Sequence, residues 1–122
     1  MVKFFDRKGK FNWVDENNVV VGFDSSSLCC ESFGYFYSKV SNPTEAERID
    51  EMTARQLEDY HFDTSFFEDG DVGGDVGGTA TFKMVNSDGE ALYLTVHNSH
   101  NGYYSHGFDM FQNGLKIHAG DL

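Results

Sequence analysis

Short runs of β-branched and aromatic residues, separated by turns rich in Asn, Asp and Gly, recur along most of this chain. Residues 19–24 contain the run Val19-Val20-Val21, which is typical of a strand, because branched side chains pack well on a pleated surface. Residues 10–14 form a similar run, and the polar residues 15–18 between them favour a turn. These two runs therefore predict a hairpin, and the pattern as a whole restricts the chain to a mainly β fold.

Other segments show the same alternation. Phe33, Tyr35 and Tyr37 alternate with smaller residues over 28–38, which predicts a third strand. Residues 79–85 alternate in the same way before a turn at 86–89. Asn-Gly is the strongest short signal for a two-residue hairpin turn, because both residues must take φ > 0. Asn101-Gly102 therefore predicts that 91–100 pairs with 103–111, and Asn113-Gly114 predicts a turn before a last strand at 115–118.

One segment has helical character. Asn42 is a suitable N-cap, Pro43 suits the first helical position, and Glu45 stands three residues after the cap. Apolar residues then follow at helical spacing up to residue 60: Ala46, Ile49, Met52 (or Thr53), Leu57 and Tyr60. We therefore expect one helix over 43–60.

These elements define the expected fold. A chain of 122 residues is one domain, residues 1–122. Its fold class is α+β: a mainly antiparallel curled sheet, or a small β-sandwich, of six or seven strands with one helix packed on it. Residues 68–78, with a tandem Asp-Val-Gly-Gly, are expected to form a mobile acidic Gly-rich loop.

The charge of the chain limits its partners. Twenty acidic residues against nine basic ones give a net charge of -11. Direct binding to nucleic acid or to anionic lipid normally needs a basic patch, and the sequence has no basic cluster. A basic protein surface or a cation are the remaining partner classes, and the alternative is that the acidity only maintains solubility.

The sequence also predicts a location. It has no apolar run of about 18 residues, and residues 1–8 lack the apolar core of a signal peptide. Cys29 and Cys30 are adjacent and cannot form an ordinary structural disulfide, which favours reduced thiols. We therefore expect a cytoplasmic protein.

The acidic residues concentrate in the middle of the chain. Residues 43–75 contain eleven acids and two arginines. A row of carboxylates on the exposed face of a helix approximates the charge spacing of a nucleic-acid backbone. Such a face would suit the DNA-binding groove of a basic host protein, with fast electrostatically steered association. The residues expected to bind are Glu45, Glu47, Asp50, Glu51, Glu58, Asp69 and Asp71.

A metal site is the alternative. In the hairpin predicted around Asn101-Gly102, His97 would lie directly opposite His106, with Cβ atoms about 4.5–5.5 Å apart. Two imidazoles at that distance can bind Zn²⁺, Ni²⁺ or Cu²⁺, given further ligands. The candidates for those ligands are Cys29, Cys30, Glu31, His61 and Asp109. The competing interpretation is a polar histidine pair on a sheet face.

Two weaker possibilities concern the thiols and the acidic loop. A nucleophilic cysteine at position 29 or 30 would need one of the hairpin histidines as its base, and no oxyanion-hole motif accompanies it. Asp69, Asp71 and Asp75 are spaced by glycines but lack the pattern of a calcium-binding loop. Neither possibility supplies a catalytic residue.

Two short motifs resemble a known family. Cys29-Cys30-Glu31-Ser32 and Asn101-Gly102-Tyr103-Tyr104-Ser105 are similar in order and separation to motifs of a family of small uncharacterised domains found in bacteria and bacteriophages. The resemblance would cover residues 18 to about 110, and the acidic middle segment departs from it. It implies a compact, mainly β domain of phage or mobile-element origin, and it transfers no catalytic role.

The sequence as a whole favours a non-enzymatic interaction protein of this type, acting in the host cytoplasm on a basic host protein and inhibiting it. The alternative is a metal-binding protein or metal-dependent enzyme that uses His97 and His106. A virion component is neither supported nor excluded. An unpaired strand edge would allow a homodimer.

Overall fold

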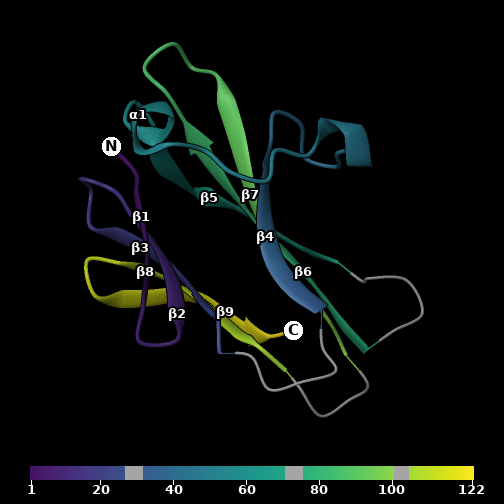
Figure 1. Ribbon diagram of the computed structural model, residues 1–122. Coiled ribbons are helices and arrows are strands. Elements are labelled where there is room, and N and C mark those ends of the chain that lie inside the picture. The colour runs from purple at the N-terminus through teal and green to yellow at the C-terminus, as the bar shows by residue number, and fades with distance from the viewer. Residues whose placement is uncertain (27–31, 71–75, 101–104) are drawn as a thin grey trace.

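Two antiparallel sheets make up the protein (Figure 1). The structure, a computed structural model, describes residues 1–26, 32–70, 76–100 and 105–122. Within these residues the five-stranded sheet has the order β1 (Lys3–Arg7), β2 (Lys10–Val14), β3 (Val19–Asp24), β8 (Gly107–Gln112) and β9 (Leu115–Asp121). The four-stranded sheet has the order β4 (Ser32–Ser38), β7 (Ala91–His100), β6 (Val76–Val85) and β5 (His61–Gly70).

The sheets pack face to face around one core. Trp13, Phe23 and Met110 of the five-stranded sheet and Phe82 and Leu94 of the four-stranded sheet are fully buried in the same cluster. Alternation along each strand directs these side chains inward and the intervening ones outward. The mainly antiparallel fold is therefore confirmed: the described residues form nine strands in two sheets instead of six or seven strands, and they form no curled single sheet.

Several predicted strands and turns are confirmed. Strands β2 and β3 have the expected bounds, and β4 and β6 contain the alternating residues that predict them. Asn113 and Gly114 take φ of 52° and 80°, which is the pair of positive angles that a two-residue hairpin turn requires. Lys8 and Gly9 have the same pair of angles (54° and 74°) between β1 and β2, a hairpin that the sequence analysis did not predict.

The predicted helix over 43–60 is wrong. Two separate short helices occur instead: a 3₁₀ turn, η1 (Glu45–Glu47), and one turn of α-helix, α1 (Ala54–Leu57). Between them Ile49 is extended, and its backbone N–H and C=O pair with those of Tyr37 at the edge of β4. Thr53 caps α1 as a second helix start, with Gln56 completing its capping box. Strand-like pairing of Ile49 and the second cap therefore interrupt the helix.

The predicted hairpin between 91–100 and 103–111 is also wrong. Strand β7 lies inside the four-stranded sheet, paired with β4 on one side and β6 on the other. Strand β8 lies in the other sheet, between β3 and β9. Because both edges of β7 are occupied, β8 has no place beside it, and the chain changes sheets between the two strands. Residues 101–104, which include the Asn-Gly pair, lie outside the described residues.

The acidic loop expected at 68–78 is shorter than predicted, because β5 continues to Gly70 and β6 begins at Val76. A register shift after Asp63 lets Phe62 and Phe67 both reach the core, paired with Met84 and Phe82 respectively. Residues 71–75 lie outside the described residues. Among the helices that the structure describes, none is both long and apolar enough to span a membrane.

A buried hydrogen bond joins the two sheets and gives a first prediction. Trp13 Nε1 donates to Tyr37 Oη at 2.9 Å, and both side chains are buried. Tyr37→Phe leaves the indole N–H without its partner, so we expect the free energy of unfolding to fall by about 1–3 kcal/mol. Trp13 is the single tryptophan, and its fluorescence during urea denaturation measures the change.

The matched control for this prediction is Tyr35→Phe. Tyr35 is half-buried and its hydroxyl has no hydrogen bond among the described residues. The Tyr35→Phe variant should therefore lose less than half as much free energy of unfolding as Tyr37→Phe. Equal losses in the two variants would show that the bond to Trp13 contributes nothing specific.

Candidate functional site

The acidic residues that the sequence predicts to bind a partner lie in two places. Strand β4 ends, β5 begins, and β6 turns into β7 at the same end of the four-stranded sheet, the upper end in Figure 1. Residues 44–59 connect β4 to β5 and so lie at this end, with five of the predicted residues: Glu45, Glu47, Asp50, Glu51 and Glu58. Asp69 lies near the other end of β5, about 25 Å away along the strand. Asp71 lies outside the described residues.

Additional carboxylates join the first group. Asp59 follows α1, and its Oδ2 accepts a hydrogen bond of 2.7 Å from Ser87 Oγ in the β6–β7 turn. This contact places the turn, with Asp88, beside the end of α1. We call the resulting surface the acidic end, which consists of Glu45, Glu47, Asp50, Glu51, Glu58, Asp59 and Asp88. Asp88 could not be recognised as a member from the sequence, because only the fold brings 86–89 next to 58–59.

The carboxylates of the acidic end are exposed and have no basic partner. All seven residues are exposed, and in the described part of the chain none has a Lys, Arg or His nitrogen within 4.0 Å of its carboxylate. Arg48 lies within the segment, but its guanidinium stands 4.6 Å from the centre of the Phe36 ring, on the outer face of the four-stranded sheet. Arg55, in α1, also lies within the segment and forms no ion pair with the seven carboxylates, so ion pairs among the described residues do not neutralise the negative charge of this end.

Two members of the acidic end also support its local structure. The carboxylate of Glu47 accepts a hydrogen bond of 2.8 Å from the backbone N–H of Thr44, and this bond lowers the pKa of Glu47. The charge of Glu51 acts on a neighbouring group: burial is the main cause that raises the pKa of Tyr35, and the negative charges of Glu51 and Asp6 raise it further. Glu45 and Asp50 have no such side-chain role among the described contacts, which makes them the best positions for charge reversal.

The predicted metal pair is not formed. His97 lies on the outer face of the four-stranded sheet, opposite Gly34 and Thr79 and with its ring 5.8 Å from that of Phe36. His106 is buried at the edge of the core, where its ring stacks on Phe33 and Nδ1 is 2.6 Å from the backbone oxygen of Asp24. The predicted cross-strand pairing is wrong because β7 and β8 belong to different sheets. His97 therefore lies on the outside of the sandwich, while His106 is buried beside the core.

The other proposed ligands do not complete a site either. Asp109 pairs with Lys10, and His61 begins β5 opposite Val85. Cys29, Cys30 and Glu31 lie outside the described residues. Among the described residues no group of three or more His, Cys, Asp or Glu side chains could hold a metal ion.

The environment of His97 predicts a pH dependence. Burial lowers the pKa of His97 below 6.5, and the nearby Arg48 charge lowers it further. The unfolded chain therefore binds a proton on this residue more readily than the folded protein. We expect the free energy of unfolding to be highest above pH 6.5 and to fall as the pH drops below it. Denaturation of His97→Gln should show a shallower fall, and identical profiles would exclude His97 as the cause.

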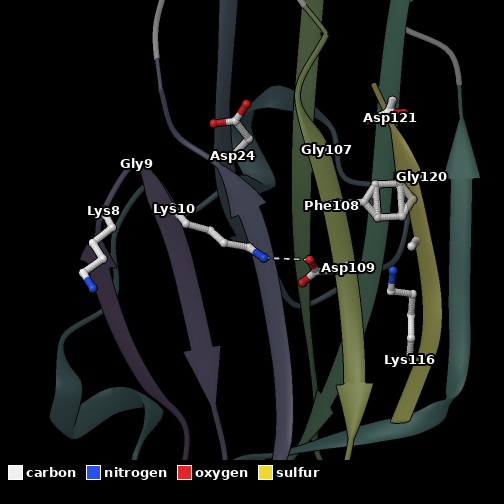
Figure 2. A pocket seen from close by; sticks show the side chains of 11 residues that line it. Lys8, Gly9, Lys10, Asp24, Gly107, Phe108, Asp109, Lys116, Gly120 and Asp121 are labelled. Carbon is white, nitrogen blue, oxygen red and sulfur yellow. Dashed lines mark hydrogen bonds and ion pairs between the residues drawn. The ribbon is translucent and has the colours of Figure 1, made fainter. Parts of the chain in front are cut away.

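A second polar surface lies on the outer face of the five-stranded sheet (Figure 2). It is an open depression of about 600 Å³ between the β1–β2 turn and β9. Glycines, Ala119 and Phe108 line it together with six charged side chains: Lys8, Lys10, Lys116, Asp24, Asp109 and Asp121. Lys10 crosses over Gly22 to reach Asp109, with 2.6 Å between Nζ and Oδ2. This surface was not predicted from the sequence, since its charges come from four strands and a turn.

No known protein family matches the chain, and comparisons with curated proteins and with solved structures also find no match. The resemblance to small bacterial and bacteriophage domains therefore stays a prediction. The function is accordingly inferred from the geometry of the two charged surfaces.

Proposed function

We propose that this protein is a non-enzymatic interaction protein of phage or mobile-element type. Its acidic end binds the basic, nucleic-acid-binding surface of a host protein in the cytoplasm and blocks that surface. The observation that carries this proposal is the set of seven exposed carboxylates at one end of the sandwich, none of which has a basic partner within the ranges that the structure describes. Carboxylates held in internal ion pairs would instead serve to stabilise the fold and would not be available to a partner.

The physical case concerns both the rate and the specificity of binding. Concentrated charge of one sign steers a partner of opposite sign during diffusion and raises the association rate. It also disfavours DNA, RNA and anionic membranes, which the net charge of -11 repels. The carboxylates do not form the straight helical row expected from the sequence. They lie on η1, on the residues beside η1 and α1, and on the β6–β7 turn. This end of the sandwich would enter the groove of the partner.

Capture of proteins from a bacterial lysate tests the proposal, with wild-type protein compared with a charge-reversed acidic end. Glu45→Lys/Asp50→Lys removes charge from the acidic end without altering a described side-chain hydrogen bond. Glu68→Lys/Asp69→Lys makes the same change in net charge near the other end of β5, where both side chains are exposed. We expect a basic partner to be retained by wild type and by the second variant, and lost with the first.

Competition with DNA completes this test. A partner held through its nucleic-acid-binding surface should be released by a short DNA duplex. Equal capture by both charge-reversed variants, or capture that DNA does not affect, would contradict the proposed function.

A further inference from the structure

The charges of the protein are divided between its faces. The strand register places three rows of side chains across the outer face of the five-stranded sheet, on the side opposite the core. These rows and the adjoining β1–β2 turn carry five of the nine basic residues: Lys3, Arg7, Lys8, Lys10 and Lys116. Against them stand three aspartates, Asp24, Asp109 and Asp121. This cationic face is therefore net positive in a chain whose net charge is -11.

Most of these cations are available to a partner. Lys10 is paired with Asp109, but the other four have no carboxylate within ion-pair distance in the described ranges. Apolar side chains separate them: Val14, Val20 and Phe111 occupy neighbouring positions in the row that ends at Lys116. Phe5, in the next row, is 43% exposed. The face therefore offers both cations and apolar contact area.

The surface that best complements this face belongs to the same chain. The acidic end presents unpaired carboxylates together with half-buried Met52, and both surfaces are fixed parts of one sandwich. We propose that the cationic face of one molecule binds the acidic end of a second copy. This inference rests on the proposed function, because the acidic end would bind both the basic host protein and the second copy. A basic host protein would therefore displace the second copy. Because the two surfaces differ, the contact is heterologous and can continue beyond a dimer.

The size of the face sets the strength of the contact. Five strands spaced about 4.8 Å apart, with three rows of side chains about 6.7 Å apart, cover roughly 500 Å². That is well below the roughly 800 Å² per partner of a stable interface, so the association is weak and needs high protein concentration. At an ionic strength of about 0.15 M the Debye length of about 8 Å screens the repulsion between whole molecules while contact charges still interact.

Sedimentation equilibrium of the purified protein at about 0.15 M salt tests the proposal. At a protein concentration of about 1 mM, we expect the weight-average mass to rise by about half above the monomer value, in line with dissociation in the millimolar range. Lys8→Glu/Lys116→Glu should remain monomeric, and so should Glu45→Lys/Asp50→Lys. Mixing the two variants should restore the association, because each then carries a surface complementary to one on the other.

The outcomes separate this inference from the proposed function. A wild-type protein that stays at 13.8 kDa, or a mixture that stays monomeric, overturns self-association. The Lys8→Glu/Lys116→Glu variant keeps its acidic end and should still capture a basic partner from lysate. A wild-type protein that self-associates but captures no basic partner would instead overturn the proposed function alone.

Discussion

Replacing Asp15 by alanine is expected to lower the free energy of unfolding by about 3–5 kcal/mol, the largest loss among the single carboxylates described. Asp15 is buried, and its carboxylate accepts three backbone hydrogen bonds. Oδ1 accepts from Asn17 and Val19 at 3.0 Å, and Oδ2 accepts from Phe62 at 2.8 Å. The first two bonds shape the β2–β3 turn, and the third ties that turn to the first residues of β5 in the other sheet.

Urea denaturation followed by Trp13 fluorescence measures this loss. Asp88→Ala is the matched control, because Asp88 is exposed and its carboxylate accepts no hydrogen bond among the described residues, so it should change stability by no more than about 0.5 kcal/mol. Asp15→Asn keeps one acceptor oxygen and should lie between the two. If Asp15→Ala were as stable as the control, the link between the sheets through Asp15 would be refuted.

Gly77→Ala is the second substitution with a large expected effect, again about 3–5 kcal/mol. Gly77 lies in β6 opposite Ser99, at φ of 122°, which side chains rarely tolerate. A Cβ added there would lie 2.1 Å from the carbonyl oxygen of Asn98, so the two strands would have to separate. The clashing atom belongs to the backbone of β7 and cannot move aside as a flexible side chain would. The substitution is therefore expected to weaken the pairing between β6 and β7.

Gly89→Ala separates the two causes of that loss. Gly89 also has positive φ, 79°, but an added Cβ there has no atom within 4 Å. This control should cost only the conformational strain, about 1–2 kcal/mol. Equal losses at the two positions in thermal or urea denaturation would show that the close approach to Asn98 has no effect.

The strands were predictable where the information is local. Alternation of Phe33, Tyr35 and Tyr37 and the branched run at Val19 place β4 and β3 correctly, because each strand buries one face in a continuous core. Strand β5 was missed because its register shift after Asp63 breaks the alternation that identifies a strand.

The errors arose where distant contacts decide the structure. Residues 43–60 have the caps and spacing of a helix, yet Ile49 pairs with Tyr37 and ends it. Asn101-Gly102 is a strong turn signal, but strand partners depend on which edges are free, and both edges of β7 are taken by β4 and β6. Local propensity contains neither piece of information.

The candidate site was predicted in part for the same reason. The acidic composition of 43–75 identified Glu45, Asp50 and Glu51 as exposed carboxylates without any knowledge of the fold. Their separation from Asp69 follows from the direction of β5, and the addition of Asp88 follows from the contact of Ser87 with Asp59. The cationic face could not be recognised from the sequence, because its residues come together only through the order and register of five strands.

The central claim is that the acidic end is the contact surface, and mapping of backbone amide chemical shifts during titration with the captured partner tests it most directly. We predict that, at a protein concentration low enough to keep the protein monomeric, the changes concentrate in residues 44–59 and in the β6–β7 turn, while the outer face of the five-stranded sheet is unaffected. Changes confined to that outer face or to the Asp69 end of β5, with residues 44–59 unchanged, would contradict the account.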